Sequence, residues 1–127
     1  VSKTTNRSVM PLKEQGVLDL MDGETELAPG INAFPTPGHT PGHMSLLIAS
    51  NNKRALLVGD ILGSPMQATE TAYRYTPDWN AEMGVEARNT ILDQAEKENA
   101  IVLGSHLSYP GWGTLIRWNG RRYWQAL

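Results

Sequence analysis

Glycine and proline are distributed unevenly along this chain, and their distribution limits the folds that it can adopt. The 127 residues include 12 Gly and 8 Pro, more than an all-helical bundle would tolerate. These residues show no fixed period, which excludes a collagen-like chain. The stretch Trp79–Asn99 contains no proline and a single glycine, Gly84. We therefore expect short strands joined by tight turns, together with one long helix.

Apolar runs between the turn residues predict the strands. Val17–Met21 and Glu24–Ala28 flank Asp22-Gly23, a strong hairpin signal, and are expected to pair. Further strands are predicted at Ile31–Thr36, Met44–Ala49, Arg54–Val58, Ala100–Gly104, Thr114–Trp118 and Arg121–Trp124. The last two would form a hairpin about Asn119-Gly120. This order predicts an α/β or α+β layered fold, with a helix over at least one face of the sheet.

The predicted helix 79–99 carries an apolar stripe at three-to-four-residue spacing, which Arg88 interrupts. Asp78 is the expected N-cap residue. At the other end of the chain, residues 1–15 are polar, with a short helix expected near Pro11–Gln15. We expect this segment to be a remainder of a longer chain and residues 16–127 to form the domain.

Composition excludes several classes of protein. Hydrophobic residues make up 40% and charged residues 19% of the chain, which does not fit a disordered protein. The net charge of -2 gives no field for binding nucleic acid. Apolar runs fall far short of the ~20 residues that span a bilayer, so no membrane association is expected. Cysteine is absent, which excludes disulfides and thiolate zinc sites and is compatible with the cytoplasm.

The three histidines are the most informative residues. His39 and His43 lie in a Pro-Gly-His-Thr-Pro-Gly-His turn segment, whereas His106 follows Gly104-Ser105. His39, Asp60 and His106 each follow a predicted strand. Because strand ends of an α/β sheet meet at one edge, we expect these three side chains to converge.

Two imidazoles and a carboxylate suit a divalent metal. The same residues would also serve a hydrolytic dyad without metal. There is no Gly-x-Ser-x-Gly segment to supply a serine nucleophile, so residue types favour metal.

Three segments resemble metal motifs of the metallo-β-lactamase superfamily. These are Thr36–His43, Leu57–Asp60 and Gly104–His106, in the order found in that superfamily. The longer segment Gly104–Gly113 is most similar to the branch that contains methyl parathion hydrolase and quorum-quenching lactonases. The resemblance covers roughly residues 16–127.

The resemblance implies the C-terminal half of an αββα sandwich, with a mixed sheet, one long covering helix and a terminal β-hairpin. It also implies two divalent metals, expected to be zinc, at one edge of the sheets. His39 would bind the first metal, His106 the second, and Asp60 would bridge both and act in catalysis. His43 would support the loop by hydrogen bonding.

One metal motif of the superfamily, His-x-His-x-Asp-His, is missing from this chain. The resemblance therefore implies part of a hydrolase in which a metal-bound hydroxide attacks a small ester, lactone or organophosphate. Since a stable zinc site takes three or four protein ligands, we expect the chain alone to bind metal weakly and to be inactive. It would form a homo-oligomer or associate with the missing N-terminal half.

Two other functions remain open at this stage. A truncated fold of this kind would also serve as a non-catalytic interaction module or pseudoenzyme, and a redox relative of the superfamily would bind a single iron. For the hydrolase, aromatic residues in or next to the two irregular loops are candidates to line a pocket for a small-molecule substrate. These are Tyr73, Tyr75, Trp79, Tyr109 and Trp112. The Arg- and Trp-containing run 117–124 fits an exposed sheet face better than a nucleic-acid surface.

Overall fold

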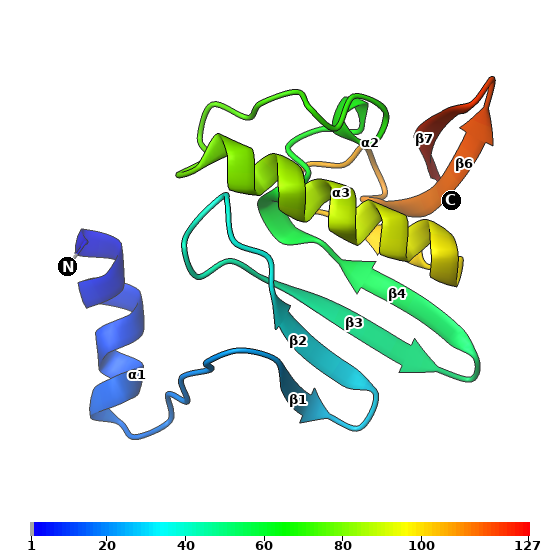
Figure 1. Cartoon of the computed structure of the whole chain (residues 1–127). Helices are drawn as coiled ribbons and strands as arrows, with labels where there is room; N and C mark the ends of the chain where they lie inside the picture. Colours follow the sequence, from blue (N-terminus) through cyan, green and yellow to red (C-terminus); the bar gives the residue numbers. More distant parts are fainter. Residues whose placement is uncertain (1) are drawn as a thin grey trace.

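The computed structural model describes residues 2–127, in which a seven-stranded mixed sheet packs against one long helix (Figure 1). The strands lie side by side in chain order, and every neighbouring pair is antiparallel except β4 and β5, which are parallel. The strands are β1 (Thr25–Ala28), β2 (Ile31–Pro35), β3 (Met44–Ser50), β4 (Lys53–Leu57), β5 (Ile101–Leu103), β6 (Trp112–Trp118) and β7 (Arg121–Ala126). The helices are η1 (Thr5–Val9), α1 (Met10–Glu14), η2 (Gly59–Ile61), α2 (Met66–Thr69) and α3 (Ala81–Glu98).

The parallel pair β4–β5 requires a long crossover, which contains α3. The prediction of a mixed sheet with one covering helix and a terminal hairpin is confirmed. The predicted strands after residue 23 and the predicted helix end within two residues of the observed bounds.

The core lies between α3 and one face of the sheet. Leu56 and Val102 are paired across β4 and β5 and point toward the helix, where Ile91 and Leu92 meet them. All four side chains are essentially inaccessible to solvent. Burial of an aliphatic side chain contributes roughly 1.5–3 kcal/mol, so this layer supplies most of the stability at the centre of the sheet.

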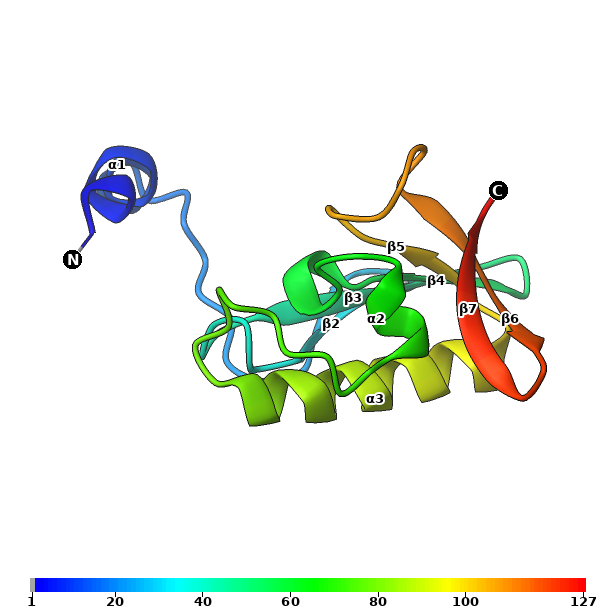
Figure 2. The same ribbon diagram turned by 90° about the horizontal axis from the view of Figure 1, so that it is seen from above.

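The opposite face of the sheet is open. Leu46, Leu57 and Leu103 occupy paired positions on this face and remain partly exposed. Among residues 2–127 no helix packs on this side, as the view along the sheet shows (Figure 2). The sheet therefore has one covered and one uncovered apolar face.

The predicted strand Val17–Met21 is wrong. This segment has no regular secondary structure and pairs with no strand among residues 2–127, and Leu20 is 86% exposed. β1 pairs with β2 through the Pro29-Gly30 turn, so the Asp22-Gly23 signal yields a bend rather than a hairpin. The apolar run was present, but the segment does not pair with the edge strand β1 or with any other strand of the described residues.

Three further observations concern the helices. Asp78 does not cap α3; the side chain of Asn80 accepts the Met83 N–H at 3.1 Å and is the N-cap. The short helices η1 and α1 lie apart from the sheet (Figure 1). No helix within residues 2–127 combines the length and apolar character needed to cross a bilayer.

Candidate metal centre

His39 lies in the loop that joins β2 to β3. The N–H groups of Trp79 and Asn80 donate to the carbonyl oxygens of His39 (3.1 Å) and Gly38 (3.0 Å), which holds the loop against the start of α3. Gly38 has a φ of +143°, and a Cβ atom there would collide with the backbone of Gly84. This close approach of loop and helix fixes the position of the His39 imidazole.

Asp60 lies in the turn η2, directly after β4, and is linked to the same loop through His43. The backbone N–H of Asp60 donates to Nε2 of His43 at 3.2 Å, and Nδ1 of His43 lies 2.9 Å from Oγ1 of Thr36. Because Nε2 accepts a hydrogen bond, the neutral ring carries its proton on Nδ1 and donates it to Thr36. Burial lowers the pKa of His43, and the nearby His39 adds to this effect, which favours the neutral ring. His43 therefore joins two loops and presents no free lone pair.

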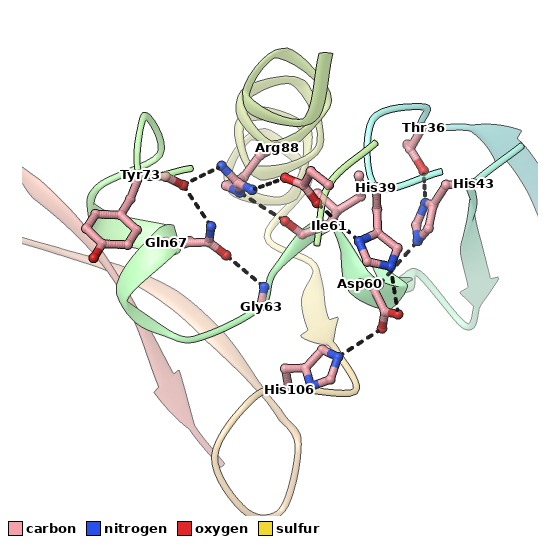
Figure 3. Close-up of polar contacts among 11 residues, drawn as sticks. Thr36, His39, His43, Asp60, Ile61, Gly63, Gln67, Tyr73, Arg88 and His106 are labelled. Carbon is pink, nitrogen blue, oxygen red and sulfur yellow. Dashed lines mark hydrogen bonds and ion pairs between the residues drawn. The ribbon is translucent and has the colours of Figure 1, made fainter. Parts of the chain in front are cut away.

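The three predicted ligands lie together at one edge of the sheet (Figure 3). Nε2 of His39 is 3.4 Å from Oδ2 of Asp60, and Nε2 of His106 is 3.3 Å from Oδ1 of the same carboxylate. The Asp60 side chain is 36% exposed, so the centre is open to solvent. Each carboxylate oxygen thus faces a different imidazole.

Sequence reasoning missed the residues that hold His39 from behind. Nδ1 of His39 lies 3.1 Å from Oδ1 of Asp78, whose side chain is only 2% exposed. Within residues 2–127, Oδ2 of Asp78 has no hydrogen-bond partner, and it lies 3.8 Å from Nη2 of Arg88, which is fully buried. The signal was available, because an arginine in the apolar stripe of a helix requires a buried acceptor or counter-charge.

The predicted pocket aromatics occupy different positions. The ring of Tyr75 stacks beside His39 with centroids 6.0 Å apart, and it lies 6.2 Å from the ring of His106. Tyr75 therefore borders the centre. The other four side chains are exposed, and their part in a substrate pocket stays a prediction; they are Tyr73, Trp79, Tyr109 and Trp112.

A hollow of about 590 Å³ opens beside the centre on the uncovered side of the sheet. Its lining is largely apolar and includes Leu57, Leu103, Leu107 and Tyr109, together with Ser105 next to His106. The hollow is therefore suited to the apolar part of a small molecule.

The donor set fits two cations better than one. Within the described residues, no three His, Cys, Asp or Glu side chains are grouped closely enough to hold one metal ion. Two imidazole Nε2 atoms instead face separate oxygens of one carboxylate. A carboxylate oxygen and an imidazole lone pair repel each other unless a proton or cation lies between them. The residues that would hold such a pair of metal ions are His39, Asp60 and His106.

Comparison with solved structures gives closely superimposable folds. AidC, a dizinc quorum-quenching lactonase, matches 97% of this chain with a TM-score of 0.77 and 24% identity, over 44% of its own length. The hydrolase AbOPH, described as a member of the beta lactamase superfamily, matches 94% of the chain with a TM-score of 0.78 and 24% identity. This chain has the fold of the metallo-β-lactamase superfamily. It covers 41% of AbOPH, so only part of the metallo-β-lactamase fold is present, and the coverage fits its C-terminal half.

Sequence comparison points to the lactonase-like branch of the metallo-β-lactamase superfamily. An N-acyl homoserine lactonase from Bacillus sp is 28% identical over 87 residues, which cover 68% of this chain. A second N-acyl homoserine lactonase, from Bacillus cereus, is 26% identical over 92 residues. The chain spans about a third of the length of these curated relatives (34%). No family model matches the sequence.

Proposed function

We propose that this chain forms one half of the dinuclear centre of a hydrolase that opens a lactone or cleaves a related small ester. One observation carries the proposal: the two oxygens of Asp60 face Nε2 of His39 and Nε2 of His106 at 3.4 and 3.3 Å. Asp60 would then hold both cations, and each imidazole would hold one of them. Zinc suits this combination of nitrogen and oxygen donors.

The residues of this chain would share the work of binding and orientation. Asp60 would hold the two cations at a fixed separation and can take up a proton during hydrolysis. His39 would be kept in place by Asp78, and Tyr75 would limit the space above the imidazoles. When bound, the pair of cations would acidify a water molecule and polarise the carbonyl oxygen of the substrate.

The hollow beside the centre supports a substrate with an apolar portion. Leu57, Leu103 and Leu107 line it, and Ser105 connects it to His106. An acyl chain attached to a polar lactone ring would place its apolar part here and its ring at Asp60. Because the curated relatives are N-acyl homoserine lactonases, we favour lactones over organophosphates.

The chain supplies too few donors to hold metal tightly on its own. Each cation would receive one imidazole and one oxygen of Asp60, whereas zinc sites take three or four protein ligands. The remaining donors would come from polypeptide carrying the His-x-His-x-Asp-His motif, packed against the open face of the sheet. The chain alone would then bind zinc weakly and lack activity.

A zinc titration tests this proposal. For the chain joined to an N-terminal segment with the His-x-His-x-Asp-His motif, we expect about two ions per molecule and hydrolysis of an N-acyl homoserine lactone. His39→Ala and His106→Ala should each lower the stoichiometry to about one. Asp60→Asn should abolish the pair, whereas Asp93→Asn, at an exposed carboxylate, should change nothing. An unchanged stoichiometry in His39→Ala would refute the assignment.

A non-catalytic interaction module is the second candidate. The open apolar face and the incomplete donor set favour it. A joined protein that binds no zinc and hydrolyses neither a lactone, an aryl ester nor a phosphotriester, yet binds a partner through the open face, would support this alternative.

A further inference from the structure

Arg88 is the most deeply buried charged residue in the described chain, with no exposed surface. It projects from the middle of α3 toward the proposed metal centre, on the side of His39 away from Asp60 (Figure 3). Burial lowers the pKa of Arg88, while the charge of Asp78 opposes this effect. A buried guanidinium is strongly destabilising unless its donors are satisfied, so its contacts show what it holds in place.

Three backbone carbonyl groups accept hydrogen bonds from Arg88. Nε donates to the carbonyl oxygen of Ile61 at 2.9 Å, and Nη1 donates to those of Thr71 (2.7 Å) and Tyr73 (3.2 Å). Ile61 directly follows Asp60, and Tyr73 lies two residues before Tyr75. Arg88 thus links two segments to α3: the one that follows Asp60 and the one that precedes Tyr75.

The fourth contact of Arg88 is electrostatic. Its Nη2 atom lies 3.8 Å from Oδ2 of Asp78, and this oxygen has no other partner within the described residues. The second oxygen, Oδ1, faces Nδ1 of His39 at 3.1 Å. The guanidinium therefore compensates the charge of a carboxylate that is buried against the imidazole.

We propose that Arg88 is a positioning residue of the centre and that it acts through Asp78 on the His39 imidazole. With the charge of Asp78 compensated, the carboxylate accepts the proton on Nδ1 of His39. The Nε2 atom is then directed to Asp60, the side on which a cation would bind. Without Arg88, the buried carboxylate of Asp78 would lose its counter-charge and the contact that fixes its orientation, so Nδ1 of His39 would lose an acceptor in a fixed position. The role of this geometry in metal binding rests on the function proposed above, whereas the geometry itself does not.

Nitrogen-15 spectra of the imidazoles test the proposal on the 127-residue chain without added metal. Only three histidines contribute, so each ring can be followed separately. In the unsubstituted chain, we expect Nδ1 of His39 to carry a proton. In Arg88→Met, the proton should move from Nδ1 to Nε2 of His39 in a large fraction of molecules, while the signals of His106 stay unchanged. In Arg88→Lys, which retains a cation, the proton should remain on Nδ1 even if the melting temperature falls.

Asp78→Asn provides a second route that leaves the three carbonyl contacts of Arg88 intact. The amide oxygen should turn toward the guanidinium and the amide NH₂ toward His39, so Nδ1 should again lose its proton. This variant decides the matter if Arg88→Met does not fold. Arg74→Met is the matched control, because Arg74 is 67% exposed and pairs only with Glu82 among the described residues. It should leave all three rings unchanged.

Persistence of the proton on Nδ1 of His39 in both Asp78→Asn and folded Arg88→Met would overturn the proposal and leave Arg88 a purely structural residue. A zinc titration of the chain joined to the N-terminal segment with the His-x-His-x-Asp-His motif separates this result from failure of the proposed function. Zinc binding weakened by about 10- to 100-fold in Arg88→Met of the joined protein, with the altered ring, supports both proposals. An altered ring in a joined protein whose His39 never responds to zinc supports the positioning role and counts against the metal centre.

Discussion

Gly38 and Gly84 lie in direct backbone contact, so that a Cβ atom on Gly38 would collide with the main chain of Gly84. The contact joins the loop that carries His39 to the first turn of α3. Gly84 also lies beside Asp78, whose Oδ2 atom would be 2.8 Å from a Cβ atom on Gly84. A glycine that weakens the helix by itself is therefore required where helix, loop and buried carboxylate meet.

Gly84→Ala should lower stability, although alanine normally favours a helix over glycine by about 1 kcal/mol. The new methyl group would press on Asp78 and on the His39 loop. Thermal unfolding should show a lower midpoint, and the imidazole signals of His39 should shift. Gly42→Ala is the control, since a Cβ atom there meets nothing within 4 Å and should leave both readings unchanged. A higher midpoint for Gly84→Ala would contradict the packing described here.

Gly63→Ala should displace the ring of Tyr75. A Cβ atom on Gly63 would lie 2.8 Å from two ring carbons of Tyr75, which borders both His39 and His106. The aromatic ring shifts the proton resonances of both imidazoles, so these resonances should move together in the variant. Tyr75→Leu, which removes the ring current, should move them in the same proton spectrum. Resonances that stay fixed in both variants would show that Tyr75 does not border the centre in solution.

Acid should destabilise the chain through Glu96. Hydrogen bonds from Arg117, then from Arg122, lower the pKa of Glu96 from 4.5 to about 2. Between these values the unfolded chain binds more protons than the folded chain. The contribution of Glu96 is therefore complete above pH 4.5 and is lost as the pH falls toward about 2.

Urea unfolding at several pH values measures this contribution. In Glu96→Gln, the free energy of unfolding should fall less steeply between pH 4.5 and about 2 than in the unsubstituted chain. Glu82→Gln is the control, because the ion pair of Glu82 with Arg74 is largely exposed and exposed pairs contribute little. A slope in Glu96→Gln as steep as in the unsubstituted chain would refute the assignment.

The open sheet face should cause the chain to associate in the absence of other polypeptide. Leu46 and Ile48 on β3 lie on this face together with Leu57, and contiguous apolar surface of this kind drives association. Sedimentation velocity should show larger species as concentration rises. Ile48→Lys should reduce them, whereas Leu20→Lys, at an exposed position outside the sheet, should not. If the chain stays monomeric at all concentrations, the prediction that the open sheet face drives association is wrong.

The local sequence pattern was sufficient to predict most of the strands and the long helix. The strands after residue 23 were predictable because turn residues interrupt short apolar runs, and α3 because its apolar residues recur every three to four positions. The strand predicted at Val17–Met21 is wrong because a strand exists only when a neighbouring strand pairs with it, which an apolar run does not reveal. The prediction of Asp78 as the N-cap is wrong because a carboxylate near the start of a helix can also point into the protein, and that of Asp78 contacts His39.

The sequence by itself determined which side chains can do chemistry and that each follows a strand end. His39, Asp60 and His106 were recognisable from the turn residues around them. Only the tertiary structure decided that the two imidazoles face different oxygens of one carboxylate, and that Asp78 and Arg88 stand behind His39. Those relationships join segments far apart in the chain. They are set by packing between α3 and the loops, which no local sequence pattern encodes.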